Sequence, residues 1–254
     1  MSKSPLSSSL KVFFTGHWSS KDIHVSRKKS SRIIDPSLEK KALLSWQIMM
    51  QRAKAQGSKL WDSDVYRFEE SKAKGKELNL VFSVIPFSIR LGMNELTPEI
   101  KDLGYDFASR GIFSSCLIRT NDSKYVFIEK SSKYYTQKKY AYVGGVLSQS
   151  EYSLQTGEDL FFSVKKEISE ELGISETEIS SMFLRLGYLT ENWNVCFLFE
   201  ALINKSSKEL ANLFIVHNDG EAQAVVFIES ENLQKKINIF EPKDQAKFML
   251  LNLA

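Results

Sequence analysis

Residues 157–174 read Gly157-Glu158-Asp159-Leu160-Phe161-Phe162-Ser163-Val164-Lys165-Lys166-Glu167-Ile168-Ser169-Glu170-Glu171-Leu172-Gly173-Ile174. Aliphatic side chains recur at every fourth position of this stretch, at Leu160, Val164, Ile168 and Leu172. Residues four apart lie on the same face of an α-helix, so the spacing predicts a helix with one buried face. Glycine is the residue that most often ends a helix in a left-handed conformation, and Gly173 follows directly. The stretch therefore predicts a helix of about four turns.

The acidic side chains near the end of this predicted helix are poorly placed for helix stability. Glu167 precedes Glu170 by three residues and Glu171 by four, so the three carboxylates project as neighbours. They repel one another and lie at the negative end of the helix dipole. A divalent cation would reverse both penalties, and carboxylate oxygens suit Mg²⁺, which shares its coordination with water and substrate phosphates. The alternative is a solvated acidic face, partly offset by a pair between Lys166 and Glu170, and the helix alone leaves both interpretations open.

The same residues, with Gly144-Gly145 before them, resemble the Nudix box of the Nudix hydrolase superfamily. The pattern G-x5-E-x7-R-E-U-x-E-E-x-G-U, with U aliphatic, is matched in register from Glu158 to Ile174. Two features depart from it: the loop after Gly145 is longer than usual, and Lys166 replaces the customary arginine, which alone can orient a carboxylate with a bidentate fork. The resemblance implies an α+β protein with the α/β/α sandwich of the Nudix fold, and we expect a small N-terminal α+β domain beside it.

The resemblance also implies roles for individual residues. In this superfamily Mg²⁺, with Mn²⁺ as a substitute, is held at the positions of Glu167, Glu170, Glu171 and the carbonyl of Gly145. Lys166 and Glu158 would orient these ligands, and the catalytic group would comprise Lys166 and the three glutamates. An attacking water needs a general base, for which Glu171 and the loop residue Glu191 are both candidates. The implied reaction is metal-dependent hydrolysis of the pyrophosphate in a nucleoside diphosphate linked to another group.

A narrower resemblance extends outside the box, over most of residues 40–230. Trp61-Asp62, Phe87 and the segment 122–131 are similar to the UDP-glucose/UDP-galactose pyrophosphatase branch of the superfamily. In that branch, residues at the positions of Trp61, Phe87 and Lys130 face the nucleotide sugar. This implies UDP-glucose or UDP-galactose as the substrate, with UMP and the sugar 1-phosphate as products.

Several residues do not decide between a UDP-sugar and other substrates. Ala141 and Val146 stand where the branch carries an acidic and a polar residue. Trp61 and Phe87 suit a uracil clamp, because a pyrimidine stacks on an aromatic ring, but they also suit the core of the N-terminal domain. The alternatives are a Nudix hydrolase for ADP-ribose, a dinucleotide or a coenzyme A derivative, and a catalytically weak module that binds a nucleotide sugar. The three mutually repelling glutamates favour an enzyme, whereas Lys166 favours the module.

Composition narrows the class of partner. The 254 residues carry 34 Lys and Arg against 31 Asp and Glu, a net charge of +3. This balance argues against nucleic acid or an anionic membrane as the main partner, because both demand clustered cations. Cys116 and Cys196 each lie in an apolar run, which predicts two buried thiols in a reducing compartment. With no apolar stretch that suits a signal peptide or a membrane span, we expect a cytoplasmic protein that binds a small nucleotide sugar; its oligomeric state stays open.

The chain is expected to divide near residue 105. Residues 1–105 would form the N-terminal α+β domain and contribute to substrate binding, and residues 106–254 would form the Nudix hydrolase domain. Asp35-Pro36 predicts the start of an amphipathic helix that ends at Gly57. Strands are predicted at 10–14, 60–68, 78–89, 112–119, 125–130, 187–190, 194–201 and 224–228, and a last helix at 242–253.

Overall fold

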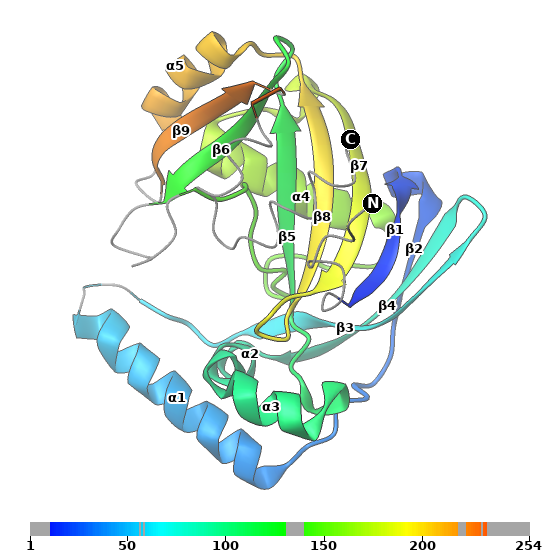
Figure 1. Ribbon diagram of the computed structural model, residues 1–254, viewed down its shortest axis with the longest axis vertical. Coiled ribbons are helices and arrows are strands. Elements are labelled where there is room, and N and C mark those ends of the chain that lie inside the picture. The colour runs from blue at the N-terminus through cyan, green and yellow to red at the C-terminus, as the bar shows by residue number, and fades with distance from the viewer. Residues whose placement is uncertain are drawn as a thin grey trace, which may run out of the picture. The chain divides into compact units, whose positions relative to one another are not determined.

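The computed structural model describes residues 11–55, 57, 59–130, 140–217, 222–229 and 231–232, which mix helices with two β-sheets (Figure 1). The helices are α1 (Pro36–Ala55), α2 (Phe87–Met93), α3 (Thr97–Leu103), α4 (Gly157–Leu172) and α5 (Ser207–His217). The strands are β1 (Val12–Trp18), β2 (Ile23–Arg27), β3 (Asp64–Lys74), β4 (Glu77–Pro86), β5 (Ile112–Arg119), β6 (Lys124–Lys130), β7 (Ile179–Leu189), β8 (Val195–Ile203) and β9 (Ala222–Glu229). The predicted α+β class is confirmed.

The chain divides into two compact units. Unit 1 comprises Met1–Ser114, Val146–Leu160 and Leu184–Leu198; unit 2 comprises Ser115–Gly145, Phe161–Phe183 and Phe199–Ala254. The chain passes from one unit to the other within β5, α4, β7 and β8. The division into an N-terminal domain and a Nudix hydrolase domain near residue 105 stays a prediction.

A three-stranded sheet of unit 1 has the order β2-β4-β3 (Figure 1). β3 and β4 form an antiparallel hairpin that turns at Gly75, whose φ of +60° favours glycine, and β2 runs parallel to β4. The prediction of one strand over 78–89 is wrong at its end, because α2 begins at Phe87. The helix starts there because Pro86 interrupts the strand and the carboxylate of Asp62 accepts a hydrogen bond from the Ser88 amide at 2.8 Å.

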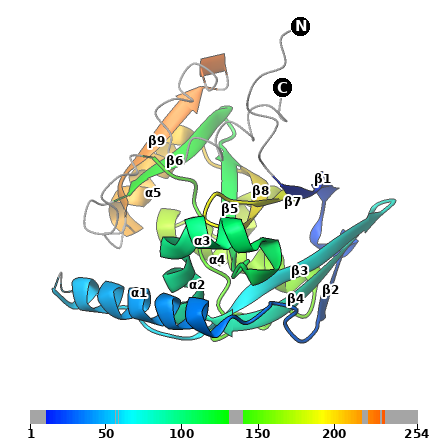
Figure 2. The ribbon, with the colours of Figure 1, turned by 60° about the horizontal axis from the view of Figure 1, so that its bottom comes forward.

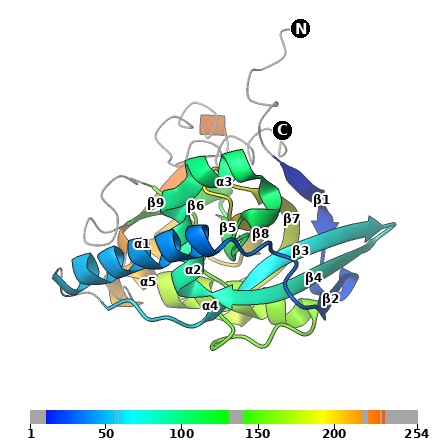
Figure 3. The same cartoon turned by 90° about the horizontal axis from the view of Figure 1, so that it is seen from below.

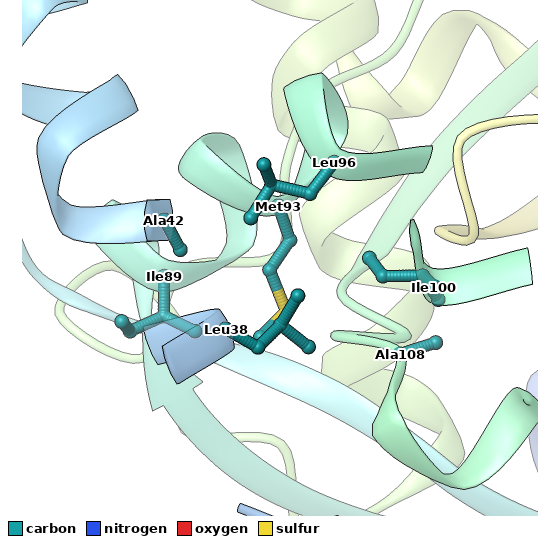
Figure 4. Packing of buried hydrophobic residues seen from close by; sticks show 7 residues of the cluster. All are labelled: Leu38, Ala42, Ile89, Met93, Leu96, Ile100 and Ala108. Carbon is teal, nitrogen blue, oxygen red and sulfur yellow. The ribbon is translucent and has the colours of Figure 1, made fainter. Parts of the chain in front are cut away.

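Helix α1 packs against α2 in unit 1 (Figures 2 and 3). The predicted start of α1 is confirmed, since the Asp35 carboxylate accepts a hydrogen bond from the Leu38 amide at 2.8 Å. The two helices approach closely at Gly92, where a Cβ atom would lie 2.1 Å from the Ala42 carbonyl oxygen. Apolar side chains from the helices and the segments after them form one cluster (Figure 4): Leu38, Ala42, Ile89, Met93, Leu96, Ile100 and Ala108.

The second sheet has the order β1-β7-β8-β5-β6-β9. In unit 1, β1 pairs antiparallel with the second half of β7. In unit 2, β5 and β6 form the predicted hairpin around residues 120–123, and β9 pairs antiparallel with β6. The segment before Gly145 follows these strands, because the Cys116 amide donates to the Val143 carbonyl and the Ile128 amide donates to the Ala141 carbonyl. These bonds fix where the Gly-Gly loop begins.

The sequence also made predictions about the two cysteines, about membrane spans and about a last helix. Cys116 and Cys196 are buried thiols outside any disulfide, and their burial is as expected. Within the described part of the chain, no helix is long and apolar enough to cross a membrane. The helix predicted at 242–253 lies outside the described residues.

Candidate functional site

Helix α4 has the buried face that its sequence predicts. Leu160, Val164, Ile168 and Leu172 are fully buried. Thr156 and Asp159 cap the first turn: the Asp159 carboxylate accepts from the Thr156 amide at 2.9 Å, and the Thr156 hydroxyl accepts from the Asp159 amide at 3.2 Å. Gly173 follows the last turn with a φ of +72°. The inward apolar face fixes the helix rotation and thereby the direction of its acidic residues.

The three glutamates of α4 differ in burial. Glu167 is half-buried, Glu170 is exposed, and Glu171 is 9% exposed. Lys166 lies 3.5 Å from the Glu170 carboxylate, which is the ion pair that the structural alternative expected. The ion pair and a metal site are compatible, because a carboxylate has lone pairs for more than one partner.

Gly145 and Glu167 lie close together in unit 2. A Cβ atom built on Gly145 would lie 2.2 Å from Oε1 of Glu167, a distance that no side chain tolerates. The Gly145 backbone therefore comes within reach of the Glu167 carboxylate because it carries no side chain. These are two of the four positions to which the resemblance assigns the metal.

The donor set suits a hard divalent cation. Three carboxylates and a backbone carbonyl are oxygen ligands of the kind that Mg²⁺ and Mn²⁺ prefer. Across the residues that the structure describes, however, no group of three or more His, Cys, Asp or Glu side chains is placed to hold a metal ion. The donors therefore fit a metal by their type and by the approach of Gly145 to Glu167, and not as a preformed cage of side chains.

Glu158, expected to orient the metal ligands, has a different partner. It lies in the first turn of α4 and belongs to unit 1. Its Oε1 accepts a hydrogen bond from the Ser20 hydroxyl at 2.6 Å. The structure thus ties Glu158 to the segment between β1 and β2, and its orienting role stays a prediction.

Trp61 and Phe87 lie on segments of unit 1 that are bonded to each other. The Phe87 amide donates to the Ser63 carbonyl at 2.8 Å, next to the bond between Asp62 and Ser88. Trp61 is 63% exposed, so the alternative that it is a core residue is wrong. Phe87 is half-buried. Lys130 ends β6, where its backbone pairs with that of Ala222, and its side chain lies outside the described part of the structure.

Glu191, the second candidate base, lies exposed in the turn between β7 and β8. Trp193 of this turn has a φ of +60°, and its carbonyl accepts from the amide of Arg110, whose φ is +50°. Left-handed conformations are costly for large side chains, and they persist where the surroundings hold them. Asn194 supplies part of that support, since its side-chain Nδ2 donates a hydrogen bond to Oδ1 of Asn94 at 2.7 Å.

A buried charged network in unit 1 was not predicted from the sequence. The Glu69 carboxylate is fully buried, accepts hydrogen bonds from Arg67, Ser31 and Ser83, and lies 3.6 Å from Arg110. Burial alone would raise the pKa of Glu69, but the hydrogen bonds from Ser31, Ser83 and Arg67 outweigh it and lower the pKa to about 2. The sequence spacing gives a weak signal, because residues two apart share a face of a regular strand, but the pairing of β3 with β4 shifts register at Glu69.

Comparisons with known proteins give structural likenesses only. No protein-family model and no curated protein matches the chain. Similar solved structures include Tm1382, provisionally named a Nudix hydrolase, at 14% identity over 57% of this chain and 72% of that protein, with a TM-score of 0.41. A Nudix hydrolase from Nitrosomonas europaea is 14% identical over 56% of this chain and 88% of its own, with a TM-score of 0.37. A NUDIX-family hydrolase from Clostridium perfringens is 17% identical over 57% of this chain and 97% of its own, also with a TM-score of 0.37. Each is a likeness to part of this chain and assigns it neither a substrate nor a site residue.

Proposed function

We propose that this protein is a Nudix hydrolase that uses Mg²⁺ to cleave the pyrophosphate of a nucleoside diphosphate linked to another group. The observation that carries the proposal is the approach of Gly145 to Glu167, on a helix whose acidic pattern matches the Nudix box in register. Packing of the buried face of α4 requires neither Gly145 nor Glu167, so the approach of these two residues is better explained by a site than by the core.

Glu167, Glu170, Glu171 and the Gly145 carbonyl would hold the metal. When bound, Mg²⁺ or Mn²⁺ supplies a Lewis acid that withdraws charge from the phosphoanhydride and lowers the pKa of an attacking water. Lys166, which lies 3.5 Å from the Glu170 carboxylate, would help to orient it through its charge. Glu171 or Glu191 would accept the proton of the water as its oxygen bonds to phosphorus, and both remain candidates for this role.

The favoured substrate is UDP-glucose or UDP-galactose, because of the narrower sequence resemblance. Water adds across the phosphoanhydride and gives UMP and the sugar 1-phosphate. Trp61 and Phe87 would stack on the uracil, and Lys130 would pair with the negative charge of the nucleotide sugar. The Trp61 side chain is 63% exposed, which leaves its ring accessible to a base.

A second candidate function is a binding module that senses a nucleotide sugar without turning it over. The observation in its favour is that the Glu170 carboxylate pairs with a lysine, which lacks the bidentate geometry of an arginine. A hydrolase for ADP-ribose, a dinucleotide or a coenzyme A derivative remains the alternative among enzymes.

Phosphorus NMR of the purified protein with a substrate panel separates these possibilities. UDP-glucose, UDP-galactose and ADP-ribose would each be incubated with Mg²⁺, with Mn²⁺ and with EDTA. We expect the UDP-sugar resonances to give way to those of UMP and the sugar 1-phosphate, with Mg²⁺ or Mn²⁺ but not with EDTA. Cleavage of ADP-ribose alone would make ADP-ribose the substrate in place of a UDP-sugar. Tight binding of a UDP-sugar without cleavage would support the binding module.

A further inference from the structure

Phe87 is braced by two neighbours within unit 1. Trp46 of α1, which is 8% exposed, meets the Phe87 ring edge-on, with ring centroids 5.9 Å apart and planes at 79°. The guanidinium carbon of Arg90 lies 5.7 Å from the centroid of the same ring. Both contacts are of favourable kinds, an edge-to-face aromatic pair and a cation over a ring. Together they leave the half-buried Phe87 ring little freedom to change its orientation.

The spacing between α1 and α2 fixes where Trp46 meets Phe87. The backbones of the two helices approach most closely at Gly92 and Ala42, where there is no room for a Cβ atom. Ala42 is one helical turn before Trp46, and Gly92 follows Phe87 within the short helix α2. Because neither helix can slide without a clash at this point, α1 sets the position of the Trp46 ring.

Trp61 directly precedes Asp62, which caps the start of α2. The Asp62 carboxylate accepts a hydrogen bond from the Ser88 amide, and the Ser63 carbonyl accepts one from the Phe87 amide, so two hydrogen bonds join the Trp61 segment to the start of α2. Trp61 differs from Trp46 in burial, since it is 63% exposed against 8%. One tryptophan thus faces solvent, while the other supports Phe87 from within.

We propose that Trp46 and Arg90 are positioning residues that hold Phe87 as a fixed stacking surface for the pyrimidine base of the substrate. The inference rests on the proposed function, and it gives α1 a specific role in recognition of the base. Trp61 and Phe87 contact the base, while Trp46 acts only through Phe87. A preset ring avoids the entropy cost of ordering it on binding, so loss of the brace weakens binding of the base and spares the chemistry at the phosphates.

The test compares Trp46→Leu and Trp46→Phe with Leu44→Ala, a control on the exposed side of the same helix, where Leu44 is 57% exposed. Calorimetry at constant free Mg²⁺ measures binding of UDP and of inorganic pyrophosphate, which lacks a base. We expect Trp46→Leu to weaken UDP binding by about threefold to tenfold and to leave pyrophosphate binding within about twofold. KM for UDP-glucose should rise while kcat stays within about twofold. Trp46→Phe should restore most of the affinity, and Leu44→Ala should match the native protein.

Three results would overturn the inference. If Trp46→Leu binds UDP as tightly as the native protein, the brace is irrelevant to recognition, although the proposed function stands. If UDP and pyrophosphate weaken equally, Trp46 has only a structural role. If the native protein binds neither ligand, the proposed function fails, and the inference fails with it.

Discussion

At Gly145, a single missing side chain allows the loop to reach the Glu167 carboxylate. Gly145→Ala would place a methyl group 2.2 Å from Oε1 of Glu167, so the loop or the carboxylate must move. We expect Mn²⁺ affinity, measured by electron paramagnetic resonance, to fall by about tenfold or more, and turnover to fall with it. Val146→Ala, at the next position, serves as the control. Unchanged Mn²⁺ affinity in Gly145→Ala would show that this contact has no part in a metal site.

At the scale of elements, the Glu69 network joins β3 to the segments around Ser31 and Arg110. Glu69→Gln leaves Arg67 and Arg110 buried without their counter-charge, and we expect the free energy of unfolding to fall by about 3–5 kcal/mol. The matched control is Glu70→Gln, an exposed residue that pairs with Lys28 at 3.0 Å, which should cost about 1 kcal/mol or less.

The same network predicts how stability depends on pH. The pKa of Glu69 is lowered to about 2 from an ordinary 4.5, so the folded state favours the ionised carboxylate. This contribution is complete above pH 4.5 and is lost as the pH falls toward 2. Urea unfolding across that range should show a shallower loss of stability in Glu69→Gln than in the native protein. Parallel curves for the two proteins would contradict the assigned role of Glu69.

Elements with strong local signals were predictable, and those that depend on tertiary contacts were not. The ends of α4 and β5 follow from periodicity, capping residues and turn residues. The strand predicted over 78–89 ran into α2, because an apolar run does not distinguish a strand from a helix that Asp62 caps from elsewhere in the chain. Helix α5 was missed, although Ser206 and Glu209 form a capping box at its start.

For the candidate site, sequence identified the acidic helix and Gly145 because both belong to one continuous motif. It could not find the Glu69 network or the left-handed Arg110 and Trp193, since their partners come from distant parts of the chain. It also left Trp61 open between a uracil clamp and a core residue; the exposure of the side chain rules out the core, and the clamp stays a prediction.

At the scale of the whole molecule, the predicted hydrolase domain depends on residues before it. β1 pairs with β7, and the Tyr66 amide of β3 donates to the Leu147 carbonyl at 2.9 Å. A fragment of residues 106–254 would lack both partners and expose an edge of β7. We expect it to unfold at a lower urea concentration than the full chain, or to aggregate. A fragment as stable as the full chain would establish residues 106–254 as an independent folding domain.

The metal-dependent chemistry assigned to α4 is tested most directly by the turnover of UDP-glucose with Mg²⁺ in native protein and in Glu171→Gln. The substitution preserves the shape of a side chain that is 9% exposed and removes its charge. We expect kcat to fall by about a hundredfold or more while circular dichroism and the melting temperature stay close to those of the native protein. Near-native turnover in a folded Glu171→Gln variant would contradict the assignment.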